Sequence, residues 1–399
     1  MISQKLFCKK CKKFHTPAEQ RRCDILSNYM IQPKDLKLTK DVFGPTYSVF
    51  VGSYGYPNVF VGPMIGMERN PIMDKPSSWF GMDYGEIIKL RGGLIRSKND
   101  QNIFSKSKFV SDMQDLAMAN TTDVEMSFKK KPFYRISFSQ YVQPMGPSGD
   151  IEKMKIAENP KIPKKVDCIV SDDLKAAEAS FRLYKTGQDV YKVSTILSSG
   201  VMGMEKNKKL VPTRYSITAV DDIIAKELMK KIREYPQLNE YLVYESYFLD
   251  NHFIILMCPG NWEYENFEAW TPDSQWYGQK KDWGILQEYE SFKGRTKYAE
   301  SEAGGYYAAR IAVTEALDSM RKQSRVVVFR EIHEGYNIPL GVWQVRENVR
   351  NAMKQRPKKF NTSQEALEYV KPKLKISINN YIKISKILSQ SRIDSFLNL

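Results

Sequence analysis

Short apolar runs separated by turn residues predict several strands along the chain. Residues 47–51 and 59–61 flank a loop rich in Gly, Tyr and Pro, a pattern of two short strands joined by a rigid loop. Residues 241–249 and 252–258 flank an Asp-Asn pair, which predicts a β-hairpin. Further strands are expected within residues 126–138, 190–197 and 325–332.

Apolar residues at helical spacing mark a second set of segments. Residues 221–235 begin with two aspartates and then repeat apolar residues every three to four positions. Thr362 followed by Glu365 is the capping-box pattern of a short helix. Other helices are expected at 304–321, 340–354 and roughly 376–389. Because strands and helices do not alternate regularly, the sequence predicts an α+β fold with a mixed or antiparallel sheet core and packed helices.

Residues 143–165 are rich in Pro, Gly and Lys and interrupt this pattern. Such a composition does not sustain regular structure for long. We expect a long loop or an interdomain crossing here.

The charge balance of the chain is strongly basic. Lys and Arg number 61 against 46 Asp and Glu, which gives a net charge of +15 and a pI of about 9.3. This excess favours a polyanionic partner, with nucleic acid ahead of an anionic membrane. The alternative is a charge-rich surface of the kind found in heat-adapted proteins.

No apolar run approaches the roughly 18 residues that a membrane span needs. The basic N-terminus also lacks the apolar core of a secretory signal. We therefore expect no membrane association and a cytoplasmic location.

Scarce metal-ligating residue types gather at the N-terminus. Cys8, Cys11, His15 and Cys23 follow the spacing C-x2-C-x3-H-x7-C, although the chain has only five cysteines and three histidines. Zinc prefers four tetrahedral nitrogen or sulfur ligands, so the pattern predicts a structural zinc site with no open position. Basic residues around it could contact phosphates. The alternative is four unrelated residues in a mobile terminus.

The C-terminus carries a short motif with aliphatic and aromatic anchors. Gln390, Ile393, Phe396 and Leu397 follow the pattern of peptides that dock on the DNA sliding clamp, PCNA. One helical turn places Ile393 and Phe396 on the same side, where they would fill a hydrophobic groove. Leu397 stands where a second aromatic residue is usual. The alternative is that these side chains pack on the body of the protein.

Three polar clusters are candidates for catalysis or phosphate binding. Asp221 and Asp222 could hold a divalent metal, Mg²⁺ or Mn²⁺, although a capped helix start is the favoured alternative. Arg214, shortly before them, could hold a phosphate. Glu331 and His333 end a buried strand, where a site or a structural ion pair would be expected.

The third cluster is a glycine turn that leads into a helix. Gly304 and Gly305 would let backbone amides approach a phosphate, with Arg310 following in the helix. An ordinary turn and cap is the alternative.

One helix carries a basic stripe. Arg346, Arg350 and Lys354 recur every four residues and could follow a DNA backbone, or simply form a solvated face. Seven aromatic residues between positions 262 and 283 could stack on exposed bases or pack in a core.

Long stretches of the chain resemble the archaeal Nre family of DNA-repair proteins. The matching stretches are GPTYSVFVGSYGYPNVFVGPM (44–64), LSSGVMGMEKNKKLVPTRYSITAVDD (197–222), YENFEAWTP (264–272), TKYAESEAGGYYAARIAVTEAL (296–317) and REIHEGYNIPLGVWQVRENVRNAM (330–353). The resemblance implies a PCNA-associated repair protein with an N-terminal cysteine cluster. The family usually has cysteine where His15 stands and often proline after the last ligand, where this chain has Asp24.

Together these features predict four parts. They are a zinc-binding module (1–26), an N-terminal α+β domain (27–258), a C-terminal α+β region (259–388) and a clamp-binding peptide (389–399). The favoured function is DNA repair with clamp recruitment and nucleic-acid binding. The alternative is a metal-dependent enzyme acting on nucleic acid or a nucleotide, and a scaffold for other repair factors is a third reading. A P-loop and an HExxH motif are absent from the sequence.

Overall fold

The chain forms two compact units, Met1–Ile224 and Ala225–Leu399. The structure is a computed structural model that describes residues 6–8, 13–15, 38–133, 146–271, 284–336 and 339–389. Both units combine strands and helices, which confirms the predicted α+β class. The expected domain boundary after residue 258 instead falls inside one sheet of the second unit, because strands on either side of it belong to that sheet.

Five strands of the first unit close into a barrel in the order β3-β4-β5-β7-β6. They are β3 (Asp41–Val51), β4 (Asn58–Gly66), β5 (Leu94–Asn102), β6 (Thr122–Phe128) and β7 (Ser148–Ile156). β5 and β7 run parallel, whereas the other neighbouring strands run antiparallel. A five-stranded Greek-key barrel with this order and orientation, and a helix between its third and fourth strands, is the topology of the OB-fold.

Alternating apolar residues fill the inside of this barrel. Val49, Val59, Val61 and Ile95 are almost fully buried and belong to one core cluster. At Gly62 the neighbouring strand comes so close that a Cβ atom would lie 2.2 Å from the Ser97 carbonyl oxygen, so only glycine fits there. The predicted pair of strands joined by a rigid loop is confirmed as the β3–β4 hairpin.

Helices complete the first unit. α3 lies between β5 and β6, and both α3 and α6 pack on β3. The helices are α2 (Tyr84–Gly92), α3 (Lys108–Met118), α4 (Lys164–Ser171), α5 (Ala176–Lys185) and α6 (Val190–Ser198), with 3-10 turns at Pro76–Ser78 and Glu205–Asn207. Among the described residues, no helix combines the length and apolar character needed to cross a membrane.

Two sequence predictions in this unit were wrong. Residues 143–165 were expected to be a loop, but β7 and the start of α4 lie there, because pairing with β5 and β6 satisfies the backbone of a polar segment. Residues 190–197 were expected to be a strand but form α6. The Asp189 side chain caps this helix, and its buried residues recur at helical spacing.

The second unit is built on a six-stranded sheet in the order β11-β10-β12-β9-β8-β13. Its strands are β8 (Tyr241–Phe248), β9 (Asn251–Cys258), β10 (Glu263–Trp270), β11 (Ile285–Glu290), β12 (Arg325–Ile332) and β13 (Lys358–Phe360). The predicted hairpin is confirmed as β8–β9, with Leu249 and Asp250 in the left-handed conformation that its tight turn requires.

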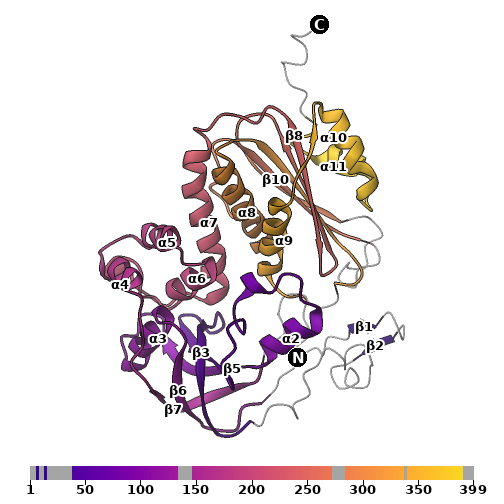
Figure 1. Cartoon of the computed structure of the whole chain (residues 1–399). Coiled ribbons are helices and arrows are strands. Elements are labelled where there is room, and N and C mark those ends of the chain that lie inside the picture. The colour runs from indigo at the N-terminus through magenta and orange to yellow at the C-terminus, as the bar shows by residue number, and fades with distance from the viewer. Residues whose placement is uncertain are drawn as a thin grey trace. The chain divides into compact units, whose positions relative to one another are not determined.

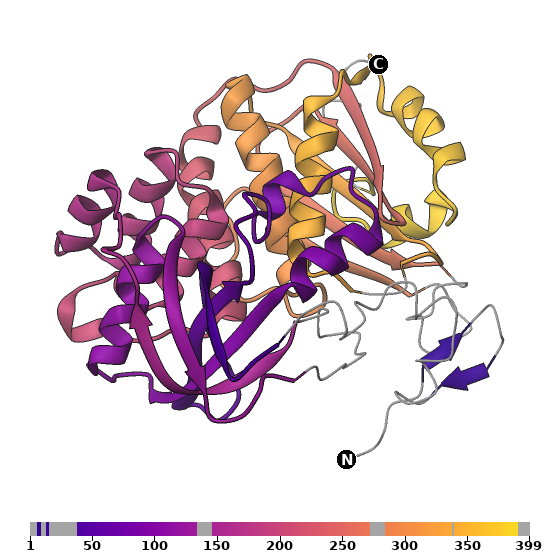
Figure 2. The same ribbon diagram turned by 60° about the horizontal axis from the view of Figure 1, so that its bottom comes forward.

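Helices cover both faces of this sheet (Figure 1). α8 (Gly304–Met320) and α9 (Val342–Lys354) lie on one face, and α10 (Ser363–Val370) and α11 (Ile378–Ile384) lie on the other. Figure 2 shows the same two layers, orange and yellow, on opposite sides of the strands. The predicted capping box of α10 is confirmed, whereas the last helix is shorter than expected.

Packed aromatic rings, one stacked pair with a third ring edge-on, form part of the core beneath α10 and α11. The rings of Phe267, Phe329 and Tyr381 have centroids 5.2–5.6 Å apart. All three are fully buried, so this face binds the last helices through apolar contact as well as through polar groups.

Two further segments complete the described chain. α7 (Thr213–Ile232) crosses the division between the two units. Near the N-terminus, β1 (Leu6–Cys8) pairs antiparallel with β2 (Lys13–His15).

Candidate functional site

Polar side chains gather on both faces of the second unit's sheet at one end of β12. Arg330 and Glu331 are consecutive and therefore point to opposite faces. In the sheet Arg330 lies opposite Phe253 and Glu268, whereas Glu331 lies opposite His252 and Ala269. Each face thus receives its own set of buried polar groups, a layout that the sequence pattern alone did not indicate.

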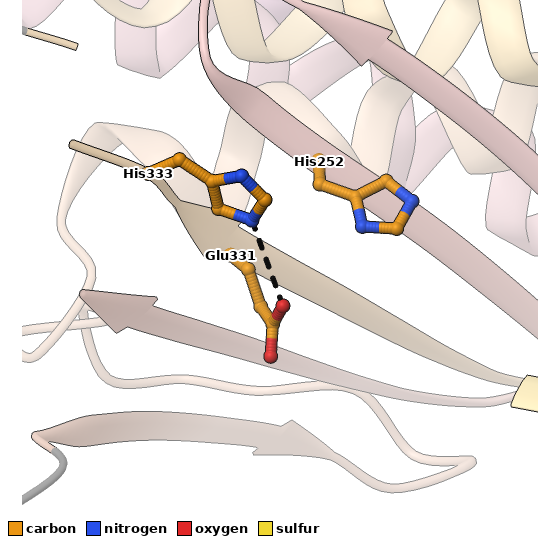
Figure 3. A group of neighbouring side chains, drawn as sticks. All are labelled: His252, Glu331 and His333. Atoms are coloured by element: carbon orange, nitrogen blue, oxygen red, sulfur yellow. Dashed lines mark ion pairs between the residues drawn. The ribbon is translucent and has the colours of Figure 1, made fainter. Parts of the chain in front are cut away.

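His252, Glu331 and His333 form a compact group (Figure 3). Glu331 lies on the sheet face that α11 covers, because the Tyr381 hydroxyl of that helix donates to it. One possible metal-ligand atom from each residue lies within 4.8 Å of the others. The His333 Nε2 atom is 3.7 Å from a Glu331 carboxylate oxygen, and the two imidazole rings are 6.0 Å apart. All three side chains are buried. The structure therefore places Glu331 and His333 side by side, and His252 joins them from β9.

Hydrogen bonds hold the members of this group in place. Glu331 accepts from the backbone amides of Lys375 and Ile376 at 2.8 and 2.9 Å and from the Tyr381 hydroxyl at 3.0 Å. His252 Nε2 lies 2.9 Å from a Glu245 carboxylate oxygen. The backbone amide of His333 donates to the Asp250 carbonyl in the β8–β9 turn at 2.8 Å.

These surroundings set the charge of the group. Burial would raise the pKa of Glu331, but the His333 ring, the two backbone amides and the Tyr381 hydroxyl outweigh it and lower that pKa below its usual value. Burial also lowers the pKa of His252, although the Glu245 carboxylate partly opposes this. The deprotonated carboxylate of Glu331 therefore lies beside His252, whose neutral form is favoured by burial.

The opposite face holds a second polar cluster beneath α8 and α9. Arg330 donates through Nε and a terminal nitrogen to Asn251 at 2.9 and 2.8 Å and pairs with Glu268. The Trp270 indole nitrogen also donates to Glu268, at 3.2 Å. Arg330 and Glu268 are each more than nine-tenths buried, so this pair is a structural element of the sheet.

The predicted phosphate-binding turn lies beside this pair. Gly304 and Gly305 begin α8, and a Cβ atom on Gly305 would lie 3.4 Å from a Glu268 oxygen. A carboxylate therefore lies near this helix start. The preceding Glu302 is buried beside Glu268, and burial together with that negative charge raises the pKa of Glu302 well above its usual value. Burial therefore favours the protonated form of this carboxyl more than in an exposed glutamate.

Arg310 lies deeper in the same helix and is fully buried. Its guanidinium pairs with Glu290, which also accepts from the indole of Trp262 and the hydroxyl of Tyr306 at 3.3 and 3.2 Å. Its burial and pairing favour a structural role for Arg310 over the predicted phosphate contact.

The predicted basic stripe does not form an exposed surface. Arg346 is almost fully buried because α9 packs on α8 and the sheet. Arg350 makes ion pairs with Glu315 and Glu347 at 2.7 and 2.8 Å. Lys354, at the end of α9, is exposed. The residues recur every four positions as predicted, but Arg346 and Arg350 face the protein and Lys354 is the exposed member of the three.

The predicted acidic pair occupies a different position from the one expected. α7 begins at Thr213, so Asp221 and Asp222 lie inside the helix rather than at its start. Among the described residues, His252, Glu331 and His333 are close enough together to hold a metal ion, whereas Asp221 and Asp222 belong to no such group. Arg214 in the first turn is exposed and stacks on Tyr215.

Several aromatic residues considered for base stacking are buried instead. Trp262, Tyr264 and Phe267 are inaccessible to solvent and pack in the second unit. Of the two cysteines that the structure describes as free, Cys258 is buried and Cys168 is exposed. Sequence reasoning missed His252, although it is one of only three histidines and begins a strand of the predicted hairpin.

The two terminal predictions fall largely outside the described residues. Cys11 and Cys23 lie outside them, and Cys8 and His15 are described only as the ends of β1 and β2. Gln390, Ile393, Phe396 and Leu397 all lie outside them. Zinc and the clamp peptide therefore stay predictions.

Comparisons with known proteins cover nearly the whole chain. A family model described as "Archaeal Nre, N-terminal" matches residues 18–277, and one described as "Archaeal Nre, C-terminal" matches residues 290–398. The DNA repair protein NreA of Archaeoglobus fulgidus is 36% identical over 352 residues, which cover 87% of this chain and 88% of the relative.

Two other relatives are similar over comparable lengths. The DNA repair protein NreB of the same organism is 34% identical over 90% of this chain and 91% of its own. The DNA repair protein NreA of Haloferax volcanii is 30% identical over 88% of this chain and 87% of its own. No solved structure matches the chain.

Proposed function

The chain belongs to the archaeal Nre family, and from that premise we propose that it is a DNA-repair protein recruited by the PCNA sliding clamp. The C-terminal peptide binds the clamp, the barrel of the first unit binds nucleic acid, and Cys8, Cys11, His15 and Cys23 bind a structural zinc ion. The observation that carries the clamp proposal is the spacing of Gln390, Ile393, Phe396 and Leu397 at the end of the chain.

The residues just before this peptide are fixed to the second unit. The fully buried carboxylate of Glu265 accepts hydrogen bonds from the backbone amides of Lys386 and Ile387 at 2.6 and 3.2 Å. The Ser385 hydroxyl in turn accepts from the amide of Leu388 at 2.8 Å. An anchor at this point supports the proposal, because the peptide then begins immediately after a fixed attachment.

Replacing Phe396 by alanine is expected to weaken clamp binding about 10- to 100-fold. A fully buried aromatic anchor contributes roughly 1.5–3 kcal/mol, and about 1.4 kcal/mol corresponds to a tenfold change in affinity. Gln390→Ala should have a smaller effect, because one hydrogen bond contributes only about 1 kcal/mol. Titration calorimetry of each purified protein with PCNA measures these differences.

Leu399→Ala is the matched control, since it changes the tail outside the motif and should leave the affinity unchanged. Deletion of residues 390–399 should abolish binding while the melting temperature stays constant. Equal affinities for the original chain and Phe396→Ala would rule out the peptide as the anchor. A lower melting temperature for Phe396→Ala would instead show that the tail packs on its own protein.

Exposed aromatic residues on the barrel support the nucleic-acid proposal. Tyr54 and Tyr56 in the β3–β4 loop are 89% and 55% exposed, and Phe60 on β4 is 41% exposed. In OB-folds, the second and third strands and the loop between the first two bind oligonucleotides. β4 and β5 are the corresponding strands here, and residues 52–57 form the corresponding loop.

Basic residues lie near these aromatic side chains. The Lys98 ammonium on β5 is 5.8 Å from the centre of the Phe60 ring. Lys129, Lys130 and Lys131 are exposed directly after β6, where an OB-fold has another binding loop. Aromatic faces that stack on bases, combined with cations that contact phosphates, are suited to single-stranded nucleic acid.

The double variant Tyr54→Ala/Tyr56→Ala is expected to bind single-stranded DNA about 10- to 100-fold more weakly. Stacking contributes about 1–3 kcal/mol per base, and about 1.4 kcal/mol is tenfold. Fluorescence anisotropy with a labelled oligonucleotide measures the affinity, which should also fall as salt rises because bound phosphates release counterions.

Tyr215→Ala provides the control, because Tyr215 is 55% exposed but lies on α7 outside the barrel. It should bind like the original chain. If the double variant kept its affinity, or if binding did not respond to salt, the barrel surface would not be the nucleic-acid binding site.

A further inference from the structure

We propose that His252, Glu331 and His333 bind one divalent transition-metal ion, independently of the N-terminal cysteine cluster and of the clamp and DNA proposals. The three residues come from β9, the end of β12 and the position just after it, and their side chains converge in Figure 3. Two of the three histidines of the whole chain lie in this one group.

An unused nitrogen atom points into the group. His333 is buried, with 10% of its side chain exposed, and its Nε2 atom has no hydrogen-bond partner among the described residues. The Glu331 oxygen that it faces is 3.7 Å away, which is beyond hydrogen-bonding distance. Buried polar atoms are rarely left without a partner. A metal ion between His333 and Glu331 would give this nitrogen a partner.

The other two ligands already have outer partners that orient them. His252 uses Nε2 for Glu245, which leaves Nδ1 as its metal-binding atom. Glu245 is held in turn by Lys373 at 2.5 Å. A carboxylate behind a metal-binding histidine is a usual arrangement, because it fixes the ring orientation and raises the basicity of the ligand. The amides that hold Glu331 fix the third ligand in the same way.

The ligand types indicate which metals fit. Two imidazoles with one carboxylate are a common set for zinc and for non-haem iron(II), whereas magnesium and calcium prefer oxygen ligands throughout. This composition favours Zn²⁺ or Fe²⁺ over the Mg²⁺ or Mn²⁺ that the sequence suggested for Asp221 and Asp222. Metal–ligand bonds are about 2.0–2.2 Å long, so binding would draw the three ligand atoms closer together than 4.8 Å.

Three protein ligands leave coordination positions open for water or for another oxygen ligand. Zinc sites with four protein ligands are usually structural, whereas those with three are usually catalytic. The group therefore has the coordination of a reactive centre, unlike the four-ligand set predicted at the N-terminus.

The test uses the full chain carrying Cys8→Ser and Cys11→Ser, which removes the N-terminal thiolates. Calorimetric titration with Zn²⁺ alone should give one ion per chain. Adding His333→Ala should weaken that binding by at least about 100-fold, because losing an outer partner alone typically costs 10- to 100-fold. Glu245→Gln changes such an outer partner and should weaken Zn²⁺ binding by about 10- to 100-fold.

His15→Ala in the same background is the matched control, because it removes the remaining histidine and should leave binding unchanged. Circular dichroism verifies that each variant is folded. His333 follows the end of β12, so its replacement leaves the strand pairing intact even where His252→Ala disturbs the sheet.

Cobalt provides a second readout with the same proteins. Co²⁺ bound to nitrogen and oxygen should show visible bands without thiolate charge transfer, and the bands should disappear in His333→Ala. Absence of saturable Zn²⁺ binding, equal affinity in His333→Ala, or a thiolate band in the cobalt spectrum would each overturn the proposal.

Discussion

Arg310→Ala is expected to destabilise the second unit by about 3–5 kcal/mol, because it leaves the buried carboxylate of Glu290 without its cation. Both side chains of this pair are fully buried. Trp262 and Tyr306 still donate to Glu290 in the variant, but neither neutralises its charge. For a unit of this size each kcal/mol lowers the melting temperature by about 2–4 °C, so we expect a fall of roughly 6–20 °C. Thermal and urea unfolding measure the change.

Lys359→Ala is the matched control for this experiment. Its ion pair with Glu240 is partly exposed, with 60% and 32% of the two side chains accessible. Exposed pairs contribute at most about 1 kcal/mol, so this variant should unfold almost like the original chain. If Arg310→Ala kept full stability but lost affinity for phosphate-containing ligands, this result would contradict the structural role and support the phosphate contact predicted from the sequence.

Glu265→Ala is expected to destabilise the second unit by about 2–4 kcal/mol. Glu265 accepts from Gln287, Ser385 and the amides of Lys386 and Ile387. Each buried donor left without an acceptor costs about 1–3 kcal/mol. Glu265→Gln keeps one oxygen acceptor and should have a smaller effect. Urea unfolding gives the stability, and hydrogen exchange should show lost protection at Lys386 and Ile387.

Glu368→Ala is the control, since this glutamate is 64% exposed and pairs only loosely with Lys371. It should change neither stability nor exchange by a measurable amount. Clamp affinity should be unaffected in Glu265→Ala, because the binding peptide itself is intact. Unchanged protection of Lys386 and Ile387 would show that other contacts, such as the aromatic core around Tyr381, hold this segment alone.

Elements with strong local patterns could be predicted from the sequence. The β8–β9 hairpin, α8, α9, β12 and the α10 capping box all lie within a few residues of their predicted positions. Each depends on neighbouring residues: a two-residue turn, an apolar face at helical spacing, or a cap. The α+β class follows from the order of these elements.

Elements that depend on distant partners were missed or misplaced. β7 is polar and rich in charge, and only pairing with β5 and β6 makes it a strand. α6 contains β-branched residues that favour strands in isolation, but its buried face and its Asp189 cap make it a helix. α7 starts eight residues earlier than expected, which moves Asp221 and Asp222 away from a helix end.

The sequence by itself determined the hairpin, the main helices and the family resemblance, because local periodicity, turn chemistry and long matching stretches are all readable along the chain. Only the tertiary structure decided which polar residues meet. His252 and Glu331 are 79 positions apart and become neighbours through strand register alone. Arg310 and Arg346, which the sequence suggested as contacts for phosphate or DNA, are buried inside the protein. The sequence could not show this, because the side of a helix that packs against the protein depends on the sheet beneath it.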